Sequence, residues 1–209
     1  NRQRGRLHAG NVQFIPHVTG EAKLFVRELA VKTQSDVVLI EVGGTVGDLE
    51  NSYFLEAMRE LAYEEGKQNV CFVNVTYILQ PGSLGEHKSK PAQLGLRTLM
   101  GLSIQPNIVI CRSENPVPDR IREKISMFSN IPLNRVYNLY DFSNIYEIPL
   151  MLKDLGIDRE VFEILKIEPK KGYTGLNFKI CEEFVQKVRN SKKETTVAIV
   201  GKYTNVHDS

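Results

Sequence analysis

A glutamate at the end of an apolar run is the residue of this sequence best placed to do chemistry. Glu41 follows the apolar residues 37–40 and opens the segment E-V-G-G-T-V-G-D-L-E. Ligands of open α/β sheets collect outside the carboxyl ends of the strands, so a carboxylate that ends a strand faces the expected site. Such an oxygen ligand suits a hard cation such as Mg²⁺. Gly43 and Gly44 lack a Cβ and let the backbone approach a nucleotide, although a solvated strand end with an ordinary turn explains the same residues.

A second segment joins lysines to the start of a helix. It reads G-E-H-K-S-K-P-A-Q over residues 85–93, and Pro91 suits the first helical position. The helix dipole and free backbone amides attract phosphate, and Lys88 and Lys90 add positive charge. We expect a polyphosphate site here, on the same sheet edge as Glu41, with Lys124 as a third cation. For two lysines alone, a solvated basic loop is the simpler interpretation.

Aromatic residues follow the last strand expected in the first 150 residues. Tyr140, Asp141 and Phe142 open the segment Y-D-F-S-N-I-Y. Its ring faces and backbone groups suit a purine. Packing of the same rings into the core is the alternative.

The composition is that of an ordinary globular protein. The chain has 209 residues, of which 42% are hydrophobic and 25% charged, with a net charge of +2. This charge favours neither nucleic-acid nor membrane binding, and no apolar run is long enough to span a bilayer. The three cysteines are widely spaced and lack a C-x-x-C pattern, which indicates reduced thiols and a cytoplasmic protein.

Hydrophobic periodicity predicts alternating strands and helices. Strands are expected over residues 12–15, 36–41, 69–78, 107–111 and 135–138. Helices are expected over residues 22–30, 54–62, 91–100 and 121–128. In the first of them Thr19 is the candidate N-cap, and the inner face is formed by Ala22, Phe25, Val26, Leu29 and Ala30. The alternation predicts an α/β fold with a mostly parallel, doubly wound, P-loop-like sheet that carries helices on both faces and is followed by a helical linker.

The pattern changes after residue 150. Short helices are expected over residues 151–155 and 161–165, a longer one over 178–188, and a fresh strand over 196–200. No G-x-x-x-x-G-K-[ST] or G-x-G-x-x-G motif is present, so the fold is expected to start after its phosphate loop. The expected organisation is a truncated first domain over 1–160, a linker over 161–194, and the first strand of a second domain over 195–209.

Five segments in order resemble the CTP synthase family. They are the Glu41 segment with F-L-E-A, the lysine segment, I-Q-P through C-R at 104–112, K-I-S-M-F at 124–128, and S-N-I-Y at 143–146. The resemblance resumes near residue 197, where A-I-V-G-K-Y-T is similar to the first strand of that family's glutaminase domain. The residues before it are only loosely similar.

The resemblance implies a two-domain glutamine amidotransferase that converts UTP to CTP. In that family ATP phosphorylates O4 of UTP and ammonia from glutamine then attacks C4. The resemblance assigns Glu41 to Mg²⁺ and the ATP phosphates, and Tyr140, Asp141 and Phe142 to adenine. It assigns these residues to UTP, or to CTP as feedback inhibitor: Asp48, Leu49, Glu50, Lys88, Ser89, Lys90, Pro91, Ala92, Gln93 and Lys124. It further implies a cytoplasmic homotetramer whose sites combine subunits, so that Lys88 and Lys124 are candidates for different copies of one site.

Several departures bear on activity. The usual K-T-K-P-T-Q reads K-S-K-P-A-Q here, and Ala92 lacks a hydroxyl whose bond to a charged group is worth about 1.5 to 3 kcal/mol. Asn51 and Tyr53 replace the usual serine and proline. The phosphate loop, the second Mg²⁺ carboxylate and the glutaminase cysteine and histidine are missing, so the chain alone is expected to be inactive.

Two alternatives to an enzyme segment of this family remain. One is a degenerate relative that acts as a nucleotide-binding or assembly module. The other is a different P-loop-type amidoligase or ATPase, for which Lys88 and Lys90 stay unexplained.

Overall fold

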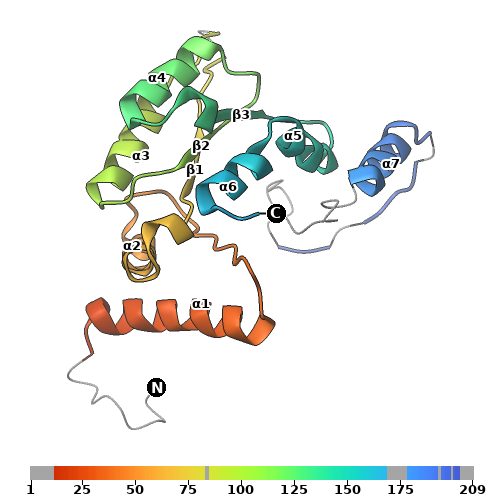
Figure 1. The fold of residues 1–209 in the computed structure, drawn as a ribbon. Coiled ribbons are helices and arrows are strands. Elements are labelled where there is room, and N and C mark those ends of the chain that lie inside the picture. The colour runs from red at the N-terminus through yellow and green to blue at the C-terminus, as the bar shows by residue number, and fades with distance from the viewer. Residues whose placement is uncertain (1–11, 83–84, 169–177, 193, 199, 203–209) are drawn as a thin grey trace.

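A three-stranded parallel sheet is the centre of the computed structural model, which describes residues 12–82, 85–168, 178–192, 194–198 and 200–202. The order is β1–β2–β3, with β1 at Val73–Tyr77, β2 at Ile108–Ser113 and β3 at Val136–Tyr140 (Figure 1). Ile110 of β2 pairs in register with Val75 of β1 and Tyr137 of β3. Helices connect the strands, so the α/β class expected from the alternation is confirmed.

Helices α3 (Lys90–Gly101) and α4 (Asp119–Ser129) cover one face of the sheet. Their inner residues join one face of β2 in a core formed by Ile78, Ala92, Leu96, Val109, Cys111, Val117, Ile121, Ile125, Ile131 and Val136. The core explains the spacing of apolar residues in both helices. Burial also raises the pKa of the Cys111 thiol to about 12, which keeps it protonated at neutral pH.

Helices α5 (Ile148–Asp154) and α6 (Ile157–Leu165) lie against the opposite face. Ile157, Val161 and Ile164 pack there with Ile108 and Ile110 of β2. The helix α7 (Phe178–Arg189) lies beside α5, and its Arg189 pairs with Glu147 of the turn η7 (Ile145–Glu147). Both faces of the sheet therefore carry helices.

Strand β1 is the less protected edge of this sheet. Val73, Val75 and Tyr77 alternate along one face, opposite Ile108, Ile110 and Arg112 of β2. Their side chains are substantially exposed, because α5 and α6 cover the face over β2 and β3 but leave it open over β1. Among the described residues β1 has one neighbouring strand, β2.

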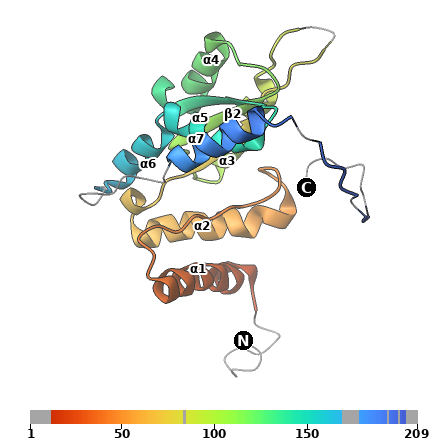
Figure 2. The ribbon, with the colours of Figure 1, turned by 90° about the vertical axis from the view of Figure 1, so that its right-hand side faces the viewer.

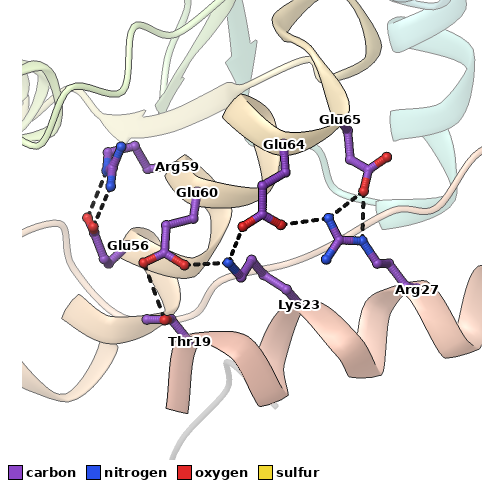
Figure 3. A network of polar contacts seen from close by, with 8 residues as sticks. All are labelled: Thr19, Lys23, Arg27, Glu56, Arg59, Glu60, Glu64 and Glu65. Carbon is purple, nitrogen blue, oxygen red and sulfur yellow. Dashed lines mark hydrogen bonds and ion pairs between the residues drawn. The ribbon is translucent and has the colours of Figure 1, made fainter. Parts of the chain in front are cut away.

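Helices α1 (Thr19–Thr33) and α2 (Ser52–Glu65) pair beneath the sheet, with α2 between α1 and the rest of the fold (Figures 1 and 2). Charged side chains join them (Figure 3). Lys23 Nζ lies 2.5 Å from carboxylate oxygens of both Glu60 and Glu64, and Arg27 Nη2 lies 2.7 Å from Glu64. Thr19 Oγ1 donates to Glu60 over 3.3 Å.

This contact corrects two expectations for α1. Thr19 is its first residue and is fully buried, and its hydroxyl reaches Glu60 on α2 instead of capping its own helix. The expected apolar inner face is wrong at Phe25 and Leu29, which are 71% and 44% exposed, while Lys23 is buried; its other members, Ala22, Val26 and Ala30, are half-buried. Thr19, Lys23 and Arg27 lie four residues apart and form one face of the helix, and ionic pairing with α2 decides which face turns inward.

Three predicted strands do not form in the described residues. Residues 12–15 lead into a short π-helical turn, η3 (Phe14–Val18), in which Ile15 stays extended. Residues 36–41 are without strand assignment, and Leu39 is 93% exposed. The same holds for residues 196–198 and 200 of the strand expected over 196–200, whose residue 199 lies outside the described residues. A β-strand needs a neighbour for its backbone groups, and the described residues offer none to these runs.

The remaining connections are short. The turn η5 (Lys67–Asn69) leads into β1 and η6 (Leu133–Arg135) into β3. Helix α6 extends across residue 160, where the first domain was expected to end. Within the described residues no helix combines the length and apolar character needed to cross a membrane.

The ionic contact between α1 and α2 can be tested by substitution. Lys23→Ala leaves Glu60 without its cation and Glu64 with Arg27 alone, so we expect the free energy of unfolding to fall by about 1 to 3 kcal/mol. Lys32→Ala, at an exposed position of the same helix, should change it by less than about 1 kcal/mol. Urea unfolding followed by circular dichroism measures both.

The dependence of stability on acidic pH gives a second test of the Lys23→Ala substitution. Hydrogen bonds from Lys23 and Arg27 lower the pKa of Glu64, so its contribution is present above the unfolded value of about 4.3 and is lost as the pH falls through the lower folded value. The unsubstituted protein should therefore lose more stability than Lys23→Ala between pH 6 and pH 3. Equal losses in both proteins would contradict the contact.

Candidate functional site

The loop after β1 carries the first group of candidate residues. Leu79 and Lys88 form an antiparallel bridge, with Lys88 N donating to Leu79 O over 2.7 Å. The Gln80 side chain and Gly85 N make further bonds across the loop. The loop extends past the carboxyl ends of the strands, beside α4 (Figure 2). Lys88 is thus held by backbone pairing at the edge where ligands of parallel sheets bind.

Two cations lie within 4 Å of one carboxylate at this edge. Lys88 Nζ lies 2.7 Å from Glu86 Oε2, and Arg120 Nη2 of α4 lies 3.8 Å from Glu86 Oε1. The hydrogen bond from Lys88 is the main cause that lowers the pKa of Glu86, and the charges of Arg120 and Lys124 act in the same direction. The structure therefore places Lys88 in contact with Glu86, and the charge of Lys124 reaches the same carboxylate within one chain.

Arg120 and Glu86 were missed by sequence reasoning. Arg120 precedes Lys124 by four residues and so lies on the same side of α4. Glu86 lies two residues before Lys88. The helical spacing of the two cations was the signal that could have identified Arg120.

The start of α3 follows the lysine loop directly. Lys90 and Pro91 are exposed in its first turn, whereas Ser89 is buried and its hydroxyl accepts a bond of 3.2 Å from the Gln93 side chain. Ala92 is 2% exposed and packs in the core. Its side chain therefore fills apolar space, and the first turn faces solvent through Lys90 and Pro91.

The loops after β2 and β3 join the same edge. Asn115, after β2, donates to the Gln80 side chain over 2.9 Å. The rings of Tyr140 and Phe142 stack with centroids 4.9 Å apart, and Asp141 accepts a 2.6 Å bond from Arg112 at the end of β2. The aromatic pair expected to contact a purine thus lies at the carboxyl ends of the strands, packed ring against ring.

The Glu41 segment forms a braced turn. Thr45 N donates to Asp48 Oδ2 over 2.9 Å, and the buried Asn51 side chain donates to the carbonyl oxygens of Gly43 and Thr45. Gly44 has a φ of +82°, and a Cβ there would lie 3.0 Å from Asn51 Nδ2. A larger residue at position 44 would therefore be strained and would crowd the Asn51 side chain.

This turn lies apart from the lysine loop. A Cβ on Gly47 would lie 3.5 Å from Thr98, in the last turns of α3, whereas Lys90 is at the start of that helix. The orange segment between α1 and α2 runs beside α2, and the loop after β1 extends away from it (Figures 1 and 2). Glu41 does not end a paired strand, so the structure does not place it on the sheet edge that carries the lysines.

Glu41 offers its carboxylate at the surface of the glycine turn. The Glu41 carboxylate is exposed and lies 3.8 Å from the position of a Cβ on Gly43, so it stands over the glycine turn. Asp48 is engaged by Thr45 N, and Leu49 and Glu50 are exposed in the turn η4 (Leu49–Asn51). The described residues hold no cluster of three metal-ligating side chains. One carboxylate fits Mg²⁺ when phosphate oxygens supply further ligands.

Comparison with known proteins identifies the family of this chain. A family model described as "CTP synthase N-terminus" matches residues 1–167. The chain belongs to the CTP synthase family. It is 41% identical over 207 residues to the CTP synthase of Pyrococcus horikoshii, 40% to that of Synechococcus sp. JA-3-3Ab, and 38% over 211 residues to that of Lawsonia intracellularis.

These alignments cover 99% of this chain and 37 to 38% of the relatives. The chain therefore spans little more than a third of a CTP synthase of this kind. The similarity continues beyond residue 167 into the segment expected to open the glutaminase domain. The domain limits at 160 and 194 remain predictions.

The brace of the Glu41 turn yields a prediction. Asn51→Ala removes both bonds to the turn carbonyls, so amide hydrogen exchange over residues 43–48 should accelerate about tenfold or more. Asn69→Ala, which removes the bond from Asn69 to Glu65 O at the other end of α2, is the matched control. Hydrogen exchange read by mass spectrometry distinguishes them, and equal exchange over 43–48 in both variants would contradict the brace.

Proposed function

We propose that the chain is part of a CTP synthase that uses ATP to phosphorylate O4 of UTP before ammonia attacks C4. The observation that carries the proposal is the gathering of Lys88, Lys124 and the pair Tyr140–Phe142 at the carboxyl edge of one parallel sheet. Cations and aromatic rings at one edge are what a nucleoside triphosphate requires. Family membership supports the choice of UTP and CTP among nucleotides.

In this proposal the residues bind different parts of the nucleotides according to their position in the fold. Lys88, Lys90 and Lys124 neutralise the triphosphate of UTP, or of CTP acting as feedback inhibitor, beside the first turn of α3. Ser89, Pro91, Ala92 and Gln93 shape that turn, and contact with a ligand there uses exposed backbone groups. Tyr140, Asp141 and Phe142 hold the adenine of ATP.

In this proposal the Glu41 turn binds the metal ion and the pyrimidine nucleotide. Glu41 would bind Mg²⁺ together with phosphate oxygens, and Asp48, Leu49 and Glu50 would face the pyrimidine nucleotide. Bound Mg²⁺ neutralises charge that develops during phosphoryl transfer. The separation of this turn from the lysine loop within one chain supports a site that is completed by other parts of the assembly.

Further parts of the proposal rest on the family alone. They are a homotetramer in the cytoplasm, sites that combine subunits, and ammonia supplied by a glutaminase domain that begins near residue 195. A role restricted to nucleotide binding or assembly is the competing function, and turnover distinguishes the two.

The lysine assignment predicts a loss of affinity. In the complete enzyme Lys90→Ala should weaken UTP and CTP binding about tenfold, because one charge-assisted contact to phosphate is removed. Lys153→Ala, on α5 and remote from the edge, is the matched control. Isothermal titration calorimetry measures both, and unchanged affinity in Lys90→Ala would remove that residue from the site.

The Glu41 assignment predicts a loss of turnover with the fold retained. Glu41→Ala in the complete enzyme should lower the Mg²⁺-dependent rate of CTP formation by about a hundredfold or more. Glu28→Ala, an exposed glutamate of α1, is the control. A normal rate in Glu41→Ala would exclude it as a metal ligand, and nucleotide binding without turnover in the unsubstituted enzyme would favour the binding-only function.

A further inference from the structure

The cations at the carboxyl edge are already paired with a carboxylate of their own loop. Glu86 Oε2 lies 2.7 Å from Lys88 Nζ and Glu86 Oε1 lies 3.8 Å from Arg120 Nη2. Lys124 lies close enough for its charge to lower the pKa of Glu86. One negative charge thus sits among three positive charges, and the group keeps a net positive charge for an incoming anion.

These ion pairs are accessible and weak. The side chains of Lys88, Glu86 and Arg120 are 42%, 52% and 64% exposed. Exposed ion pairs contribute little because water and salt screen them. The separation between Arg120 and Glu86 exceeds hydrogen-bond length, so the N–H donors of the guanidinium are not used by Glu86. A ligand with several charges can therefore displace Glu86 from Lys88 and Arg120.

The chemistry of Arg120 suits the group that would replace Glu86. A guanidinium offers parallel N–H donors that match two oxygens of one phosphate, which a lysine ammonium cannot do. Arg120 lies in the first turn of α4 and shares a side of that helix with Lys124. The loop that carries Lys88 is fixed by backbone pairing to Leu79, so Glu86 can swing away without moving the lysine backbone.

We propose that Arg120 is a further triphosphate-binding residue and that Glu86 is an internal substitute for ligand phosphate, which nucleotide binding displaces. This rests on the proposed function, because it takes the triphosphate of UTP or CTP as the displacing group. Glu86 then lowers the affinity for polyphosphate and keeps the cations ordered when no ligand is bound.

The test compares two variants of the complete enzyme. Glu86→Gln removes the competing charge and should tighten binding of inorganic tripolyphosphate and UTP about twofold to fivefold. Arg120→Ala should weaken binding of both about tenfold. Both effects should shrink when NaCl is raised from a low concentration to about 0.3 M, because salt screens the attraction between exposed charges. Uridine, which has no phosphate, should bind equally to all forms.

Glu182→Gln is the matched control for the carboxylate, since Glu182 forms an exposed pair with Lys153 between α7 and α5. It should leave tripolyphosphate affinity unchanged. In the double variant Glu86→Gln with Arg120→Ala, the gain from removing Glu86 should be smaller than in the enzyme with Arg120. Calorimetric titration gives each affinity, and thermal melting checks that each variant is folded.

The outcomes separate this inference from the proposed function. Unchanged or weaker tripolyphosphate binding in Glu86→Gln would overturn the role of Glu86 as a substitute, and unchanged binding in Arg120→Ala would overturn that of Arg120. If Lys90→Ala still weakens UTP binding, only the inference fails. If Lys90→Ala is also without effect, the proposed triphosphate site fails with it.

Discussion

The burial of β2 between two helical layers determines where every group of the candidate edge lies. Val109 and Cys111 turn toward α3 and α4, while Ile108 and Ile110 turn toward α5 and α6. A shift of one residue in pairing would send each set to the wrong face. The register is therefore strongly specified. It also fixes the positions along the strands at which the loops after β1, β2 and β3 begin. Lys88 and Arg120 approach Glu86, and Asp141 bonds to Arg112, because these groups lie where the strands end at one edge.

The pairing of α1 with α2 follows a different physical rule. Its buried centre is ionic, with Lys23 held between two glutamates, and apolar side chains such as Phe25 face outward. Desolvation opposes the charge of Lys23, but hydrogen bonds to Glu60 and Glu64 raise its pKa overall. Such a contact depends on geometry and salt in a way that an apolar seam does not. Because Lys23 and Glu60 are largely buried, salt screens their contact less than it screens the exposed ion pairs at the carboxyl edge.

Sequence patterns predicted best the elements that depend on local residue spacing or on burial of both faces. The helices and the three paired strands were recognised for that reason. Residues 36–41 have the same apolar character as β2, yet without a partner strand in the described residues that character produced no strand. The inward face of α1 and the meeting of Glu86 with Arg120 depend on contacts between distant segments. Spacing along one segment carries no information about such contacts.

The open edge of β1 has a consequence for how the protein behaves in solution. In the described part of the chain its outer backbone groups face no strand, and Val73 and Val75 beside them are exposed. Such an edge is a template for pairing with another extended segment, including the same edge of a second molecule. Strand pairing between two copies of this chain would use β1, and a charged side chain introduced there would oppose it.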